Sequence, residues 1–213
     1  FKSYNSDHST SYAYAETRVQ GSMAMNTVVQ NDSNDYDIDV AIVFDKANIG
    51  DMGPLQARRL VRDALEYKMG QFKEDPDCKT NCVRIKYNDG YHIDFAVYRR
   101  FKEAGSDEYT YEHSGGSSWT QRDPKAITNW FQSEVSDKGK DLRKVVRLSK
   151  MFCKSRTGWV NMPGGLLQSV LCDEVYDTDY NRIDEIFYYT MIAVRDRLED
   201  STEVYNPTDP EIS

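Results

Sequence analysis

The first half of the chain carries the two-residue alternation of apolar and polar positions that is typical of β-strands. Residues 36–44 are rich in β-branched side chains and form the best strand pattern in the sequence. Three further strands are predicted, at residues 12–19, 81–87 and 91–98. The last two flank Asn88-Asp89-Gly90, which is typical of the turn of a β-hairpin.

Apolar residues recur at helical spacing over residues 55–72 and then through most of the second half. Asp123 and Pro124 predict a helix start, because Asp caps helix N-termini and Pro fits the first helical turn. The predicted helices of the second half are residues 123–136, 140–154, 164–176 and 184–198.

The remaining segments are predicted to be turns, loops and connections. Turn-forming residues predict a loop at residues 31–35 and a turn at residues 74–79, and the prolines of residues 206–210 end regular structure. Residues 102–118 are polar, contain Gly and Ser, and are predicted to connect two lobes.

The predicted elements indicate an α/β protein of the mixed α+β kind. Residues 1–118 are expected to form a catalytic lobe around a central mixed sheet, and residues 119–213 a helical lobe. The polar start and the abrupt end suggest a truncated chain or part of a longer protein.

Composition excludes several classes of protein. With 213 residues, of which 39% are apolar, the chain can bury a core. Its formal charge of −8 disfavours a protein that coats long nucleic acid, since such binding needs surplus Lys and Arg. No apolar run reaches the length of a membrane span, and the chain does not start with a secretion signal. We therefore expect no membrane and no long nucleic-acid partner.

Cysteine usage indicates a reducing compartment. Four cysteines are present without the spacing of a disulfide framework. Cys78 and Cys82 could hold a metal together, but no second Cys or His pair follows them. Free thiols are the favoured interpretation, which predicts a cytoplasmic protein.

Three aspartates are the candidates for chemistry. Asp37 and Asp39 are two residues apart on a predicted strand, so their side chains share one face. Asp94 lies within an apolar hairpin strand, where a carboxylate is costly unless it has a partner. Such hard oxygen donors suit Mg²⁺ or Mn²⁺, and two such ions can drive phosphoryl transfer. Alone, an Asp-x-Asp pair is more often a turn-flanking feature.

Together with Gly21-Ser22, these aspartates resemble the polymerase-β-like nucleotidyltransferase superfamily. Three segments are similar to the bacterial CD-NTases, relatives of cyclic GMP-AMP synthase: Q-G-S-M-A-M-N-T, D-Y-D-I-D-V and H-I-D-F-A-V-Y. Segments of the second half, such as D-L-R-K-V-V-R-L-S-K-M-F, resemble the family's helical lobe in order and spacing. The resemblance covers roughly residues 15 to 210, and we expect the family's helix before the first strand and its later helices to be absent from this chain.

The resemblance implies a role for each site residue. Gly21 and Ser22 would bind the triphosphate of the donor nucleotide, with Lys150 on a helix as a further phosphate ligand. The two metal ions, Mg²⁺ or Mn²⁺, would be held by Asp37, Asp39 and Asp94, with Asp94 also activating the acceptor hydroxyl. The family often has Ser where this chain has Gly164, so that contact would come from backbone N–H groups.

Lys150 is part of a basic stripe along one helix face, formed with Arg143, Arg147 and Lys154. A solvated basic surface is the alternative interpretation for the other three members.

The resemblance implies an active site between the lobes and a metal-dependent reaction of ATP, GTP or another NTP that releases pyrophosphate. The product would be a cyclic or linear oligonucleotide second messenger of bacterial anti-phage signalling. Two alternatives remain open: a nucleotidyltransferase that modifies RNA 3′ ends or a small acceptor, and a non-catalytic nucleotide-binding relative. The sequence identifies no regulatory partner.

Overall fold

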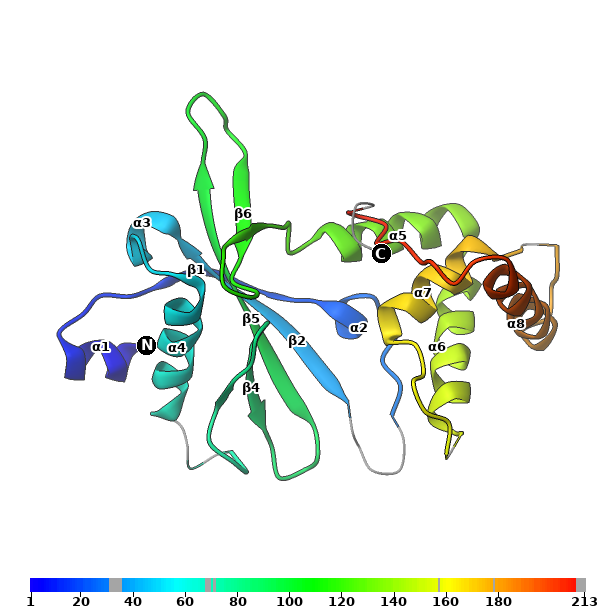
Figure 1. The fold of residues 1–213 in the computed structure, drawn as a ribbon, viewed down its shortest axis with the longest axis horizontal. Helices are drawn as coiled ribbons and strands as arrows, with labels where there is room; N and C mark the ends of the chain where they lie inside the picture. The colour runs from blue at the N-terminus through cyan, green and yellow to red at the C-terminus, as the bar shows by residue number, and fades with distance from the viewer. Residues whose placement is uncertain (31–35, 68–69, 71, 157, 178, 210–213) are drawn as a thin grey trace. The chain divides into compact units, whose positions relative to one another are not determined.

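The computed structural model describes residues 1–30, 36–67, 70, 72–156, 158–177 and 179–209, which form two compact units (Figure 1). The first, the sheet unit, comprises Phe1–Gln20 and Asn34–Lys125. The second, the helical unit, comprises Gly21–Ser33 and Ala126–Ser213. Each unit has its own hydrophobic core.

The sheet unit is built on a mixed seven-stranded sheet. Five strands follow the order β1-β2-β5-β4-β3, while β6 pairs with β5 and β7 pairs with β6. The strands are β1 (Tyr14–Val19), β2 (Asp37–Asp45), β3 (Asp77–Cys78), β4 (Val83–Lys86), β5 (His92–Lys102), β6 (Tyr109–His113) and β7 (Thr120–Gln121). β2 and β5 run parallel at the centre, and the other pairs are antiparallel. The predicted α+β class, central mixed sheet and hairpin are confirmed.

Helix α4 (Pro54–Glu66) covers one face of this sheet (Figure 1). Its Ala57, Leu60 and Val61 are buried against side chains of β2, β4 and β5, such as Phe44. These strands are apolar on this face because alternate residues of a strand share a face.

The opposite face of the sheet has a smaller apolar cluster of Ala41, Val43 and Tyr98. Asp39 lies two residues before Ala41 on β2, so its side chain belongs to this second face. The candidate acids are therefore on the face that α4 does not cover.

The helical unit contains α2 (Gly21–Ala24), α5 (Ala126–Lys138), α6 (Asp141–Lys154), α7 (Gly165–Glu174) and α8 (Ile183–Asp200). Its core gathers apolar residues from four of these helices and from Met25, which follows α2. The helical predictions for the second half are confirmed to within a few residues at each end. The largest shift is in α5, which begins at Ala126; in the segment before it, Asp123 Oδ1 accepts the backbone N–H of Lys125 at 2.8 Å.

The predicted connection at residues 102–118 is wrong. β5 extends to Lys102, and β6 folds back onto it with His113 opposite Tyr98. β6 has only five residues, and the polar composition of the whole segment conceals its short strand pattern.

Three further predictions need correction. The polar start contains helix α1 (Lys2–His8), so the expected absence of a helix before the first strand is wrong. Strand β3 lies inside the predicted turn at residues 74–79. Helix α4 ends at Glu66, earlier than predicted. The loop predicted at residues 31–35 falls outside the described residues.

The compact units do not divide after residue 118. The chain passes into the helical unit at Ala126, and Gly21–Ser33 belongs to that unit although it lies between two strands of the sheet in the sequence.

All four cysteines are free thiols. Within the described part of the chain, no helix combines the length and apolar character needed to cross a membrane.

Candidate functional site

The parallel pairing of β2 with β5 brings the three predicted acids together. Asp39 is the register partner of Asp94, and Asp37 is the register partner of His92. Partners in adjacent strands point to the same face, so the three carboxylates share one end of the face that α4 does not cover. Burial raises the pKa of Asp39, and the charges of Asp94 and Asp37 raise it further. The cluster therefore holds more negative charge than its surroundings compensate.

Two basic side chains lie within this cluster. Arg84, which pairs with Asp94 across the β4–β5 hairpin, donates from Nε to Oδ1 and from Nη2 to Oδ2, both at 2.7 Å. His92 Nε2 lies 2.5 Å from Asp37 Oδ1 without hydrogen-bond alignment. Neither residue was predicted, although hairpin pairing around Asn88-Asp89-Gly90 would have placed Arg84 opposite Asp94.

Cys82 lies next to the acids as well. Burial, with added contributions from Asp94, raises the pKa of its thiol to about 12. The thiol is therefore neutral at physiological pH and is a poor metal ligand.

The donor set of this cluster suits a hard divalent cation, because it consists of carboxylate oxygens whose mutual repulsion a cation would relieve. In the described part of the chain, no three Asp, Glu, His or Cys side chains are arranged so that they could hold a metal ion. Asp94 is instead bound by Arg84. A metal ion bound by Asp37, Asp39 and Asp94 would therefore share Asp94 with Arg84 or displace that guanidinium.

The Gly-Ser pair begins α2, directly after Gln20, whose backbone N–H donates to the Asp39 carbonyl oxygen at 2.8 Å. Gly21 has φ of 57°, a left-handed conformation that favours glycine. Thr27 N–H donates to the Ser22 carbonyl oxygen at 2.8 Å, so the chain turns back on itself after α2. Gly21 and Ser22 belong to the helical unit, whereas the three acids belong to the sheet unit.

Lys150 on α6 is buried in the helical unit, with 8% of its surface exposed. Its Nζ donates to Thr27 Oγ1 at 2.9 Å. Burial lowers the pKa of Lys150 to about 8, and the charge of Lys154 lowers it as well, whereas Cys172 raises it. The ammonium is therefore largely charged at neutral pH but is poorly compensated.

The basic stripe of α6 is only partly solvated. Arg143 Nε donates to the Met25 carbonyl oxygen at 3.1 Å, and Lys154 Nζ approaches the Val29 carbonyl oxygen at 3.5 Å. Together with the bond from Lys150 to Thr27, these contacts fasten residues 25–29, which we call the strap, along α6. Arg147 is exposed, as the alternative interpretation predicted.

Gly164 is the N-cap residue of α7 and has no side-chain cap, with φ of −60° and ψ of 161°. A Cβ atom at this position would meet open space, whereas at Gly165 it would lie 3.4 Å from Lys150 Nζ. The uncapped N–H groups at this end of α7 carry partial positive charge. Gly164 belongs to the helical unit, as do Lys150, Gly21 and Ser22.

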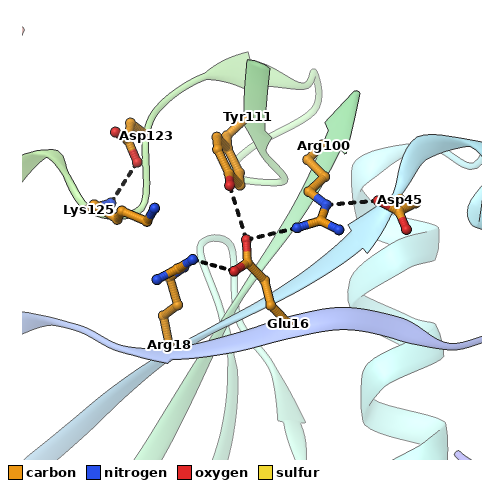
Figure 2. Close-up of polar contacts among 7 residues, drawn as sticks. All are labelled: Glu16, Arg18, Asp45, Arg100, Tyr111, Asp123 and Lys125. Carbon is orange, nitrogen blue, oxygen red and sulfur yellow. Dashed lines mark hydrogen bonds and ion pairs between the residues drawn. The ribbon is translucent and has the colours of Figure 1, made fainter. Parts of the chain in front are cut away.

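A second polar cluster lies toward the other end of β2, on the sheet face that α4 does not cover (Figure 2). Tyr111 OH and Arg100 Nη1 donate to Glu16 Oε1 at 3.0 and 3.3 Å, and Arg18 contacts the other oxygen. Arg100 Nε also donates to Asp45 Oδ1 at 2.8 Å. Although burial raises the pKa of Glu16, the bonds from Arg18 and Tyr111 lower it overall. Each carboxylate here has its cation, so this cluster links β1, β2, β5 and β6 and leaves no acid for a metal.

Comparison with known proteins finds a family match to a segment that includes residues of both units. Residues 15–98 match the family model of the nucleotidyltransferase domain of cyclic GMP-AMP synthase, DncV-like. This segment contains β2 and the first part of β5, and therefore all three acids of the cluster.

A cyclic GMP-AMP synthase of Escherichia albertii is 24% identical over 200 residues, which cover 89% of this chain and 43% of that protein. The solved structure of the Vibrio cholerae DncV cyclic AMP-GMP synthase in complex with the linear intermediate 5′ pppA(3′,5′)pG is 24% identical. Its TM-score is 0.70, and the match covers 90% of this chain and 53% of that one.

A third relative is the Bradyrhizobium diazoefficiens CD-NTase CdnG in complex with GTP. It is 16% identical, has a TM-score of 0.69, and matches over 93% of this chain and 70% of its own. These structures have the same fold as the present chain. The chain spans about half the length of the cyclic GMP-AMP synthases that it matches.

Proposed function

We propose that this chain is a CD-NTase of the polymerase-β-like nucleotidyltransferase superfamily, and that it joins NTPs through phosphodiester bonds and releases pyrophosphate. The observation that carries the proposal is the parallel register of β2 with β5, which sets Asp39 beside Asp94 with Asp37 on the same face. An acid cluster of this kind, with its excess negative charge, is suited to binding cations that accompany a triphosphate.

Each group has a role in this reaction. Ser22, Lys150 and the N-terminus of α7 at Gly164 would bind the phosphates of the donor nucleotide. Asp94 would accept the proton of the acceptor 3′ or 2′ hydroxyl, which attacks the α-phosphorus as pyrophosphate leaves. Divalent ions, Mg²⁺ or Mn²⁺, bound by Asp37, Asp39 and Asp94 would supply Lewis acidity.

The product that we favour is a cyclic or linear oligonucleotide second messenger of bacterial anti-phage signalling. The named relatives support this proposal, since they include cyclic GMP-AMP synthases and structures with GTP or a linear intermediate. We place the protein in the cytoplasm, where NTPs are available and its free thiols stay reduced.

The test is incubation of the protein with labelled ATP, GTP, CTP and UTP, singly and mixed, with Mg²⁺ or Mn²⁺. The wild type should form oligonucleotide products, which mass spectrometry identifies. The double variant Asp37→Asn, Asp39→Asn should lose activity by about 10²–10³-fold or more. Asp45→Asn is the matched control, because Asp45 is also on β2 but bonds Arg100 in the second polar cluster.

Other outcomes assign other functions. Product that forms only after addition of RNA or a small hydroxyl acceptor would identify an enzyme that modifies that acceptor. NTP binding without any product would identify a non-catalytic nucleotide-binding relative. Unchanged turnover in the double variant would refute the role of the acids.

A further inference from the structure

Thr27 contacts two of the proposed phosphate-binding residues at once. Its backbone N–H donates to the Ser22 carbonyl oxygen at 2.8 Å, and its Oγ1 accepts from Lys150 Nζ at 2.9 Å. All three residues belong to the helical unit. Thr27 therefore connects α2, which begins with the Gly-Ser pair, to the lysine of α6.

We propose that Thr27 is a positioning residue, which holds Ser22 and Lys150 in the arrangement needed to bind one triphosphate. This inference rests on the proposed nucleotidyltransferase function and deepens it. Thr27 is 0% exposed, so it acts through the two residues that it contacts.

Stability alone does not explain the hydroxyl at this buried position. A fully buried polar group is costly unless it forms hydrogen bonds, and valine would fill the same volume without that cost. The Thr27 hydroxyl is satisfied by the Lys150 ammonium. In turn, the ammonium forms no ion pair with any carboxylate in the described part of the chain, which makes Thr27 its principal polar partner in the protein.

The surroundings of Lys150 favour an anion. Gly165, the first residue of α7, lies so close that a Cβ atom there would be 3.3 Å from Lys150 Cε. An ammonium and a helix N-terminus are both positive, so their proximity is unfavourable until a negative group joins them. Of the titratable groups that act on the ammonium, Lys154 adds repulsion, and Cys172 is a buried thiol whose own pKa is raised to about 12. A phosphate group would compensate both positive charges.

The strap fixes Thr27 in this position. On either side of Thr27, α6 binds the strap through Arg143 and the Met25 carbonyl oxygen, and through Lys154 and the Val29 carbonyl oxygen. The three bonds from α6 therefore fall on every second residue of the strap. The outer two end on backbone carbonyl oxygens, and the middle one ends on the Thr27 side chain.

The experiment compares Thr27→Val, which removes the hydroxyl at equal volume, with Thr27→Ser, which keeps it. Calorimetry with inorganic triphosphate and with GTP, in the presence of Mg²⁺, should show about tenfold weaker binding for Thr27→Val, the effect of one lost hydrogen bond to a charged group. Thr27→Ser should bind within about twofold of the wild type, since its hydroxyl still accepts from Lys150.

The matched control is Thr190→Val. Thr190 is also buried and donates from Oγ1 to the Ile186 carbonyl oxygen at 2.7 Å, far along the sequence from the strap. This variant should lose a similar hydroxyl without weakening triphosphate binding. If both Val variants weaken binding equally, the effect reflects general destabilisation and the proposal is overturned.

A second measurement separates this proposal from the function on which it rests. NMR of protein labelled with ¹³C at lysine Cε, assigned with Lys150→Arg, reports the pKa of Lys150 without any nucleotide. Loss of the acceptor at Thr27 should lower that pKa by about one unit in Thr27→Val but not in Thr190→Val. An unchanged pKa overturns the role of Thr27, whereas a wild type that binds no triphosphate overturns the proposed function.

Discussion

The Arg84 guanidinium binds both carboxylate oxygens of Asp94, with Nε–Oδ1 and Nη2–Oδ2 distances of 2.7 Å. The pair joins neighbouring strands, β4 and β5, directly beside Asp39. It gives one of the three clustered acids a permanent protein cation. A divalent ion at these acids must share Asp94 with Arg84 or displace it.

Arg84→Gln should therefore lower stability in the absence of divalent ions and increase the stabilisation that such ions provide. The expected loss is about 1–2 kcal/mol, since the pair is partly exposed and Asp94 is left beside other acids. Thermal unfolding with EDTA and with Mn²⁺ measures both effects. Arg62→Gln, which removes an ion pair with Asp63 on the surface of α4, is the control. An equal Mn²⁺ effect in Arg84→Gln and wild type would exclude competition between Arg84 and the ion.

Asp39→Asn should stabilise the protein while it abolishes activity. Burial and the neighbouring acids raise the pKa of Asp39, so the folded state holds its proton more tightly than the unfolded state. The free energy of unfolding therefore falls as the pH rises from the ordinary pKa of an aspartate through the raised pKa of Asp39. The lost stability is not regained at neutral pH. Removing the charge should increase Tm by about 2–4 °C, as about 1 kcal/mol does in a chain of this size.

Chemical denaturation in EDTA at a series of acidic to neutral pH values checks this prediction. The wild type should lose stability relative to Asp39→Asn as the pH rises, and the difference should shrink when Mn²⁺ is added. In Asp45→Asn the bond from Arg100 loses the negative charge of its acceptor, so this control should be less stable than the wild type. If Asp39→Asn has a lower free energy of unfolding than the wild type at neutral pH in EDTA, the proposed repulsion among the acids is contradicted.

Triphosphate binding should weaken as the pH rises through about 8. The pKa of Lys150 is lowered to about 8 by burial and by Lys154, with Cys172 acting in the opposite direction, so the ammonium deprotonates above that pH. Calorimetric titration with inorganic triphosphate between pH 6.5 and 9.5 should show this loss, since the phosphates themselves are fully charged at the upper end. Lys150→Arg should remove the pH dependence, because a guanidinium stays charged. Affinity that is constant over this range in the wild type would exclude Lys150 as a phosphate ligand.

Gly21→Ala and Gly164→Ala should differ in their effects on stability. Gly21 has φ of 57°, so alanine there should cost about 1–2 kcal/mol of stability and disturb Ser22. Gly164 has φ of −60° and open space at its Cβ position, so alanine should change stability by less than about 0.5 kcal/mol. Thermal unfolding and GTP titration measure both. Weaker GTP binding in Gly164→Ala at unchanged Tm would support a backbone contact to phosphate, whereas normal binding would count against it.

Local patterns in the sequence predicted most elements of the fold. Period-two alternation predicted β2, β4 and β5, and the Asn-Asp-Gly turn predicted the hairpin, because both signals depend on neighbouring residues. The short strand β6 was missed because its five residues lie within a polar segment. Helix α1 was missed for a related reason, since it buries none of its residues and so has no apolar stripe.

For the candidate site, the sequence by itself determined which residues have the chemistry: the two aspartates that share a face of β2, the single aspartate of β5, and the basic residues of α6. Only the tertiary structure decided their partners. The parallel register that sets Asp39 beside Asp94 joins strands far apart in the chain, and no local pattern specifies it. Likewise, the burial of Lys150 against Thr27 depends on how the strap packs along α6, whereas the spacing of charges on the helix is the same for a buried and a solvated lysine.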